Sequence, residues 1–306
     1  MIISGIIIEQ HKSVFLVDTD NGIVPSTITG IVRSGTDKPC VGDHVGIEIT
    51  DSIPQAGLIR SVEPRRNRLI RPTIANVNQV IYVFTVAEPP IDLEAFDRFL
   101  FAVGTMSLDV LLVLNKIDLL SREDLMGTKD ISQAYRYAEY QVLEMSAATG
   151  ENVSSLTALC RGKISCLAGA SGVGKSSLLN VLFPDLNART QELSEHISRG
   201  RQTTTSTLLL KLDGGGYIAD SPGFQALEIP YVYPEETQLY FPEIKRLIGQ
   251  CRFNNCLHEN EPGCVVQEKV DSEEISGDRY EHYLHFMDIM RTHRDKYSPP
   301  GHKRPR

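Results

Sequence analysis

The sequence lacks any apolar run close to the roughly 18 residues that a membrane-spanning helix requires, which argues against a helical membrane protein. It has no excess of positive charge either, because 31 Lys and Arg stand against 39 Asp and Glu, a net charge of −8. This balance excludes a protein whose whole surface coats nucleic acid. With 23 Gly and 16 Pro, the chain has too few of both for a fibrous protein. The segment MIISGIIIEQHK has no basic residues before its apolar run and no small-residue cleavage site, so we expect no signal peptide and a cytoplasmic location.

The 306 residues are 41% hydrophobic, enough for two or three domains of about 100–200 residues each. Cys40, Cys160 and Cys166 are scattered, and we interpret them as free thiols in or near cores. Local positive charge occurs twice in spite of the acidic total. Residues 60–71 contain five Arg and one Glu, and residues 291–306 contain six Lys or Arg and one Asp. Each of these segments is either a solvated connection or a contact for phosphate groups.

The first 63 residues show short β-branched or apolar runs separated by turn signals and no helical period. These runs are residues 6–8, 14–17, 23–24 and 45–49. A closed barrel is the natural arrangement for short strands, because closure removes exposed edges. The length fits a five-stranded oligonucleotide-binding (OB) barrel, and an SH3-like barrel fits nearly as well.

From about residue 72 the pattern alternates between strand and helix, which predicts a parallel α/β sheet covered on both faces. The predicted strands are residues 77–86, 109–114, 141–145 and 163–167, with helices near 91–103, 121–139 and 152–161. Residues 206–219 then predict two strands joined by a turn at Asp213–Gly216. After about residue 230 the strands stop, and helices and loops surround a group of cysteines.

A phosphate-binding loop follows the strand 163–167 and precedes a helix-forming segment at 177–182, which is the context that this motif requires. Its glycines allow backbone N–H groups to surround a β-phosphate, Lys175 brings a charge to the β- and γ-phosphates, and Ser176 can bind Mg²⁺. The predicted phosphate site comprises Gly169, Ala170, Ser171, Gly172, Val173, Gly174, Lys175, Ser176 and Ser177.

The sequence Asn115-Lys116-Ile117-Asp118 indicates guanine rather than adenine. It lies at the carboxyl end of the strand 109–114, where ligands of open α/β sheets bind. The Asp118 carboxylate can accept from the two donors of guanine, Asn115 braces the pocket and Lys116 covers the ring. After the next strand come Ser146 and Ala147, where a backbone N–H can meet guanine O6. We therefore predict GTP or GDP as the ligand and disfavour an ATPase or kinase.

A third element, Asp220-Ser221-Pro222-Gly223, follows the strand 217–219. Asp220 can hold Mg²⁺ through water, and the Gly223 N–H can sense the γ-phosphate. Between the two phosphate elements lies Gly200-Arg201-Gln202-Thr203-Thr204-Thr205. We take Thr204 as the candidate to complete the Mg²⁺ shell, although a strand beginning explains any single Thr equally well.

The order of these elements differs from that of ordinary GTPases, in which the phosphate loop comes first. Here the guanine-binding elements precede it, so the domain is circularly permuted, which is feasible because domain termini often lie close together. The segment 220–223 then leads directly into the C-terminal region, so loss of the γ-phosphate can move that region as a unit.

Three thiolates and one imidazole occur within 14 residues, at Cys251, Cys256, His258 and Cys264, and they form the ligand set of a closed structural Zn²⁺ site.

The catalytic site, by contrast, is incomplete. Phe224 follows Gly223 where Ras-like enzymes have the Gln that orients water. We therefore expect slow hydrolysis by the protein alone and a partner that completes the site.

The chain resembles the ribosome small subunit-dependent GTPase A family (RsgA/YjeQ). The resemblance rests on the barrel and on the segments NKID, SA, GASGVGKS, GRQTTT, DSPGF and CRFNNCLHENEPGC. The resemblance implies an N-terminal OB-fold barrel over residues 1–65, a circularly permuted GTPase domain over 66–230 and a mainly helical zinc domain with a basic tail over 231–306. It also implies a late-stage maturation factor that acts on the bacterial small ribosomal subunit and is stimulated by it, which we expect to be a monomer.

One departure from the family pattern concerns hydrolysis: Gln202 stands where the family usually has His. An amide can orient water but cannot accept a proton at neutral pH. The resemblance also makes the basic segments candidate rRNA contacts. These contacts are Arg60, Arg65, Arg66, Arg68, Arg71, Arg291, Arg294 and Lys296. The alternative function is a non-enzymatic RNA-binding adaptor in which GTP is structural.

Overall fold

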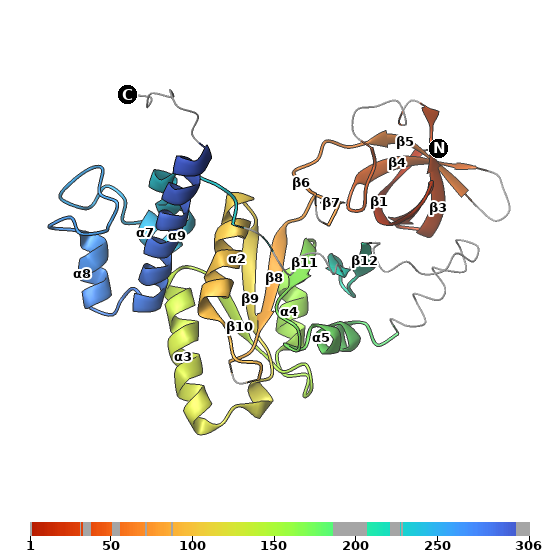
Figure 1. Cartoon of the computed structure of the whole chain (residues 1–306). Coiled ribbons are helices and arrows are strands. Elements are labelled where there is room, and N and C mark those ends of the chain that lie inside the picture. The colour runs from red at the N-terminus through yellow and green to blue at the C-terminus, as the bar shows by residue number, and fades with distance from the viewer. Residues whose placement is uncertain are drawn as a thin grey trace. The chain divides into compact units, whose positions relative to one another are not determined.

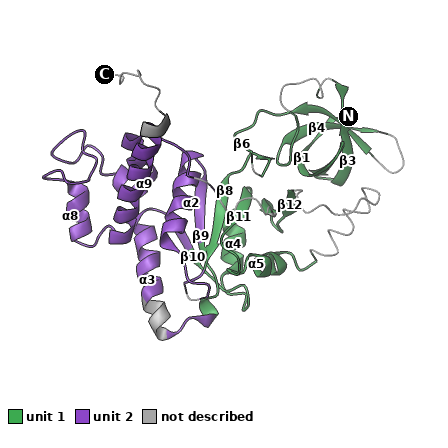
Figure 2. Ribbon diagram, viewed as in Figure 1, with its two compact units in different colours: residues 1–84, 113–118, 143–225 green, residues 85–112, 119–142, 226–306 purple. Residues whose placement is uncertain are grey.

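The structure of the chain is a computed structural model. The chain forms two compact units (Figures 1 and 2). Unit 1 consists of residues 1–84, 113–118 and 143–225, and unit 2 of residues 85–112, 119–142 and 226–306. The structure describes residues 2–30, 32, 38–50, 56–70, 72–86, 88–185, 207–220, 227 and 229–297, without the side chains of 122–126, 220 and 295–297.

The N-terminal part of unit 1 is a closed five-stranded barrel, as predicted. Its strands pair in the order β1-β2-β3-β5-β4, with β1 pairing both β2 and β4 and with β3 parallel to β5. This Greek-key barrel confirms the OB-fold among the two predicted barrels. The strand β5 is not among the predicted strands. Buried and partly exposed residues alternate only over its first four residues, so its strand pattern is incomplete. The strands are β1 (Ile2–His11), β2 (Val14–Thr19), β3 (Gly22–Ile28), β4 (His44–Thr50) and β5 (Ala56–Val62).

A six-stranded sheet has the order β10-β9-β8-β11-β13-β12, and its strands β8, β11, β12 and β13 belong entirely to unit 1. In its centre β11 runs parallel to β8 and to β13, and at its edge β12 runs antiparallel to β13, which confirms the predicted hairpin. All five residues of β11 are buried, as expected of a strand with both faces covered. The strands are β8 (Gln79–Phe84), β9 (Asp109–Leu114), β10 (Gln141–Glu144), β11 (Ile164–Ala168), β12 (Leu208–Lys211) and β13 (Tyr217–Asp220).

The remaining elements are helices and one short ribbon. Asp92 caps the first long helix, because its carboxylate accepts from the Ala95 N–H at 3.0 Å. No helix among the described residues combines the length and the apolar character needed to cross a membrane. The elements are β6 (Arg68–Leu69), β7 (Ile74–Ala75), α2 (Leu93–Thr105), η1 (Ile117–Leu119), α3 (Arg122–Tyr137), α4 (Val153–Cys160), α5 (Lys175–Leu182), η2 (Pro234–Tyr240), α7 (Pro242–Lys245), α8 (Val265–Asp271) and α9 (Gly277–Tyr297).

The core of unit 2 combines aromatic packing with buried charge. The rings of Phe101 on α2 and Phe286 on α9 meet edge to face, with 5.7 Å between their centroids. Next to them the Arg279 guanidinium forms ion pairs with the carboxylates of Asp97 and Glu243. All three of these charged side chains are at most 4% exposed. Burial would lower the pKa of Arg279, but Asp97 and Glu243 raise it well above its usual value, so the charge is retained.

Candidate functional site

The phosphate loop connects β11 to α5, as predicted. Gly174 is the N-cap of α5 and adopts a φ of 95°, and the helix begins at Lys175. The Lys175 ammonium donates to the carbonyl oxygens of Gly169 at 2.7 Å and Ala170 at 2.6 Å, so it lies against the loop that it is predicted to serve. Burial lowers the pKa of Lys175. Ser176 and Ser177 occupy the first turn of α5, next to the loop.

Two glycines of this loop are required by close contacts. A Cβ atom on Gly169 would lie 2.1 Å from the Val83 carbonyl oxygen of β8. A Cβ atom on Gly174 would lie 2.3 Å from the Asn115 side-chain nitrogen. Both glycines also have positive φ angles, which favour glycine. The loop therefore fits closely against the carboxyl end of β8 and against the guanine-binding segment.

Asn115 joins the guanine-binding elements to the phosphate loop. Its side-chain NH₂ donates to the Val173 carbonyl at 2.9 Å, and its side-chain oxygen accepts from the Ala147 N–H at 3.0 Å. Its own backbone N–H donates to Phe84 O at 2.9 Å. Since Asn115 is only 2% exposed, these bonds form away from water. One amide thus holds together three segments that lie far apart in the sequence.

The Asp118 carboxylate is oriented by Ser146. The Ser146 hydroxyl donates to Asp118 Oδ1 at 2.5 Å and accepts from the Thr149 N–H at 3.1 Å. The backbone of the two segments is also joined, because Met145 N–H donates to Leu114 O at 2.8 Å. Lys116 has a left-handed backbone, with φ at 64°. The structure therefore brings all five predicted guanine-binding residues to one end of β9 and β10, and the reading of guanine O6 by a backbone N–H stays a prediction.

The elements that would contact the γ-phosphate are less fully described. Asp220 ends β13, at the same end of the sheet as the phosphate loop, because β13 is parallel to β11. Its side chain, Gly223 and Phe224 lie outside the described residues, and so do Gln202 and Thr204. The predicted roles of these residues stay predictions.

Several of the predicted rRNA contacts are paired with acidic side chains. Arg65 donates from Nε to Asp43 Oδ1 at 2.6 Å, and Arg60 pairs with Glu48. Arg291 donates to both oxygens of Glu259, at 2.7 and 2.8 Å. Arg71 and the Lys296 side chain lie outside the described residues. Most of these arginines therefore already have acidic partners, and in the first segment Arg60, Arg66 and Arg68 are exposed.

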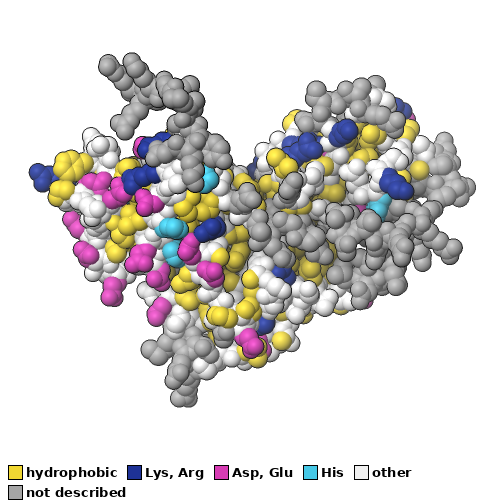
Figure 3. Space-filling model, viewed as in Figure 1, with side chains coloured by type: hydrophobic (Ala, Val, Ile, Leu, Met, Phe, Trp, Pro, Cys, Tyr) yellow, Lys and Arg dark blue, Asp and Glu magenta, His cyan; other side chains and the backbone are white. Residues whose placement is uncertain are grey.

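Acidic side chains gather on the described surface of unit 2. Figure 3 shows many Asp and Glu over its C-terminal helices, and Lys and Arg both there and over the barrel. The exposed acids of α8, α9 and the turn between them are Glu268, Asp271, Glu273, Glu274, Asp278, Glu281 and Asp288. This acidic surface is unfavourable for nucleic acid, so the barrel side is the better candidate for RNA.

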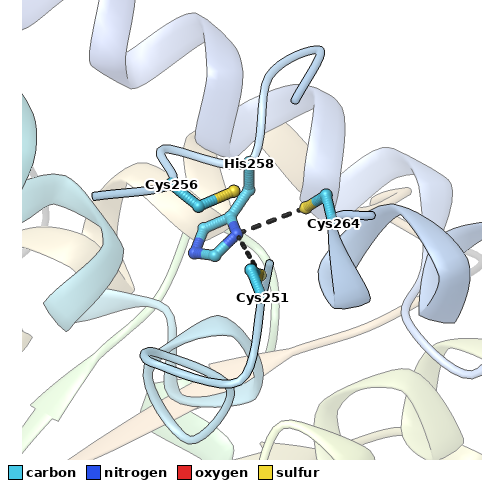
Figure 4. Close-up of side chains that lie close together, drawn as sticks. All are labelled: Cys251, Cys256, His258 and Cys264. Carbon is cyan, nitrogen blue, oxygen red and sulfur yellow. Dashed lines mark hydrogen bonds between the residues drawn. The ribbon is translucent and has the colours of Figure 1, made fainter. Parts of the chain in front are cut away.

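The four predicted metal ligands converge in unit 2. Figure 4 shows Cys251, Cys256, His258 and Cys264 pointing toward one another, and their ligand atoms all lie within 4.8 Å of one another. All four residues are buried. Burial lowers the pKa of His258, which favours the neutral, metal-binding imidazole. Burial raises the pKa of the Cys256 and Cys264 thiols, so a cation is the group that would stabilise their thiolates. This cluster can hold a metal ion.

The imidazole of His258 is oriented from outside the cluster. Its Nδ1 faces Cys251 Sγ at 3.5 Å and Cys264 Sγ at 3.4 Å, and its Nε2 faces the Gln238 side-chain oxygen at 3.2 Å. The NH₂ group of Gln238 donates to Glu235 O at 2.9 Å, which fixes the orientation of the amide. Gln238 therefore selects the ring form with hydrogen on Nε2 and a lone pair on Nδ1.

The loop that carries His258 is held by side chains from its neighbourhood. The Tyr280 hydroxyl donates to His258 O, and the Tyr283 hydroxyl donates to Leu257 O, both at 2.6 Å. The Glu261 carboxylate accepts from the N–H groups of Leu257 and Glu259, each at 2.8 Å. Sequence reasoning missed these residues and Gln238. Glu261 lies inside the motif and could have been found, but nothing in the sequence marks a Gln 20 residues away.

The comparisons with known proteins identify the family of the chain. A family model described as RsgA GTPase matches residues 62–230. The small ribosomal subunit biogenesis GTPase RsgA of Moorella thermoacetica is 42% identical over 283 residues, which cover 92% of this chain and 96% of the relative. The protein of the same name from a Geobacillus species is 39% identical over 293 residues, covering 96% and 99%.

Two solved structures are similar over nearly the whole chain. YjeQ from Thermotoga maritima matches with a TM-score of 0.78 at 36% identity, covering 95% of this chain and 99% of that one. YloQ, described as a circularly permuted GTPase, matches with a TM-score of 0.79 at 29% identity, covering 99% and 98%. The similarity thus includes the barrel and the Cys/His segment as well as the nucleotide-binding sheet.

Proposed function

Because the chain belongs to the RsgA GTPase family, we propose that it binds the small ribosomal subunit and hydrolyses GTP during late maturation of that subunit. The observation that carries this proposal is the Asn115 side chain, which joins the guanine-binding strand to the phosphate loop and to Ala147. All three segments belong to unit 1, so a monomer supplies the nucleotide site. Such a factor works in the cytoplasm, where its subunit partner is assembled.

We propose Mg²⁺ as the ion that accompanies GTP, held by Ser176 and, through water, by Asp220. Thr204 would complete its shell, and Gln202 would orient the attacking water. The positions of Ser176 at the start of α5 and of Asp220 at the end of β13 support the first two roles. The two roles in the segment before β12 rest on the family resemblance.

We propose Zn²⁺ as the metal of the Cys/His cluster. A tetrahedral zinc site with Zn–S of about 2.3 Å and Zn–N of about 2.0–2.1 Å places its nitrogen and sulfur ligands about 3.5 Å apart. The distances from His258 Nδ1 to the two facing sulfurs are 3.5 and 3.4 Å, which supports this ion. Its function would be structural, within a domain that we delimit at residues 231–306, after a barrel over 1–65 and a GTPase domain over 66–230.

The decisive experiment measures phosphate release from GTP while purified small ribosomal subunits are titrated. We expect slow turnover by the protein alone and a rise of at least about tenfold with subunits, because a partner that completes a phosphoryl-transfer site contributes about 10³–10⁵ in other GTPases. Lys175→Ala should abolish the stimulated turnover. GTP binding without any stimulation would favour the non-enzymatic adaptor instead.

A second measurement tests the base that is read. We expect Asp118→Asn to prefer xanthine nucleotides over guanine nucleotides. The amide then presents a donor where the carboxylate presented an acceptor. Competition between GTP and XTP measures this preference. Unchanged preference in the variant would contradict the assigned guanine site.

A further inference from the structure

A cavity of about 320 Å³ lies in unit 1, apart from the nucleotide site. Its walls include Lys163 and Tyr217, which stand at the amino ends of β11 and β13. The phosphate loop and Asp220 stand at the carboxyl ends of the same two strands, which run parallel. The cavity and the nucleotide site therefore occupy opposite edges of the sheet, so that a ligand in the cavity would not touch bound GTP.

The charge of the cavity is the opposite of that of the whole chain. The ionisable groups that line it, apart from the Tyr217 phenol, are His44, Arg66 and Lys163, and no acidic residue is among its described lining residues. The chain as a whole has 39 acidic and 31 basic residues. Such a grouping of basic side chains in an acidic protein indicates an anionic ligand.

The lining side chains offer hydrogen-bond donors. Among the described residues the Arg66 guanidinium has no partner, while its backbone N–H is held by the Asn76 side-chain oxygen at 2.8 Å. Lys163 Nζ donates to Gln79 Oε1 at 2.8 Å, which uses one of its three protons. The side-chain oxygen of Asn78 accepts from the Ile164 N–H at 2.8 Å, which leaves its NH₂ group as a donor. Charged and neutral donors thus line the cavity from two segments of chain.

Asp18, whose carboxylate contacts the lining residue Tyr217, is already paired. Asp18 Oδ2 accepts from the Tyr217 hydroxyl at 2.6 Å and pairs with Lys211 Nζ at 2.8 Å. Hydrogen bonds from a phenol and an ammonium reduce the repulsion that this carboxylate would exert on a bound anion. The same contacts join β2 of the barrel to β12 and β13. Residues of the barrel and residues of the sheet both line the cavity.

We propose that this cavity binds a phosphate group through Arg66, Lys163 and His44, and that the phosphate belongs to RNA. This proposal deepens the proposed function and rests on it for the choice of RNA over a free nucleotide. Phosphate is the oxyanion that matches a planar guanidinium and an ammonium together. The volume accommodates more than a phosphate alone, so the attached sugar also fits.

The test measures binding of a single-stranded 12-residue RNA to the full chain, with GDP saturating the phosphate loop, by fluorescence anisotropy at several salt concentrations. Arg66→Ala should weaken binding about fivefold or more and should reduce the slope of log affinity against log salt by about 0.7. Arg98→Ala is the matched control, because Arg98 lies outside both basic segments, is partly exposed and pairs with Glu94. It should change the affinity less than twofold.

A second arm distinguishes the source of the phosphate. Titration of GDP-bound protein with GMP, followed by NMR of the His44 imidazole, should give no shift at concentrations at which RNA shifts it. A shift with GMP that Arg66→Ala abolishes would support the phosphate site but assign it to free nucleotides. Equal RNA affinities of Arg66→Ala, Arg98→Ala and the parent protein would overturn the proposal. None of these assays uses ribosomal subunits, so failure of the proposed function would be seen separately, in GTP turnover.

Discussion

The two units solve the problem of buried polar groups in different ways. In the predicted nucleotide site of unit 1, the buried side-chain amide of Asn115 forms hydrogen bonds with neutral backbone groups. In unit 2, Arg279 is buried together with two carboxylates, and three thiols surround an imidazole. Neutral hydrogen bonds keep their geometry over a wide range of pH, whereas buried ions are stable only while every partner is present. The predicted nucleotide site is therefore preorganised, and unit 2 depends on its buried charges and, by our proposal, on a metal.

The largest effect should follow removal of the central cation of unit 2. Arg279→Met leaves Asp97 and Glu243 buried without a counter-ion, which should lower the free energy of unfolding by about 3–5 kcal/mol. Urea unfolding can be followed through tyrosine fluorescence, because the chain has 11 Tyr and no Trp. Arg98→Met, which removes an exposed pair with Glu94, should cost less than about 1 kcal/mol. Equal losses of unfolding free energy in the two variants would show that the buried ion pairs stabilise the protein no more than the exposed pair does.

The corresponding change in unit 1 is Asn115→Ala. It leaves the Val173 carbonyl and the Ala147 N–H without partners, at about 1–3 kcal/mol for each buried group. We expect GTP affinity to fall about 10- to 100-fold, measured by fluorescence titration with a labelled guanine nucleotide. Because both lost bonds are between neutral groups, the loss should be the same at pH 6.5 and pH 8.5. A loss that grows with pH would contradict the contrast between the units.

A smaller effect should follow Gln238→Leu, which removes the acceptor that faces His258 Nε2. Loss of such an outer partner typically weakens metal binding about 10- to 100-fold, and competition with a coloured chelator measures it. Gln250→Leu is the control, since the Gln250 amide donates to Arg246 O at 2.7 Å and to no ligand of the cluster. Gln238→Glu keeps an acceptor and should retain most of the affinity. Equal metal affinities of the parent and Gln238→Leu would remove Gln238 from this role.

The smallest effect concerns His282, whose ring pairs with Asp97 Oδ2 at 2.7 Å. The hydrogen bond to Asp97 raises the pKa of His282 above its ordinary value of 6.5. A raised folded-state pKa means that the stabilisation is complete below about 6.5 and is lost as pH rises through the folded-state pKa. The metal-loaded protein should therefore become slightly less stable between pH 6.5 and pH 8, and His282→Gln should lack this decline. His285→Gln, an exposed neighbour, should retain it.

The placement of the predicted nucleotide-binding residues followed largely from the sequence, whereas that of their surroundings did not. The phosphate loop and the NKID segment have fixed spacings because one backbone geometry serves one ligand, and the structure places them at one edge of the sheet. The ion pairs of Arg279 join residues up to 182 positions apart, and no spacing rule connects them. Similarly, the pairing of Arg65 with Asp43 depends on how β4 and the residues after β5 meet. Motifs thus locate chemistry, and tertiary packing decides which charges remain available.

The position of β8 has a consequence for synthesis of the chain. β8 pairs with β11 in the register Ser165↔Gln79, so the central pair of the sheet joins segments 86 residues apart. On a translating ribosome, β8, β9 and β10 all emerge before their partner β11 exists. Until β11 and the phosphate loop have been made, β8 has β9 beside it but lacks its second neighbour. The sheet of this domain can therefore be completed only late in translation.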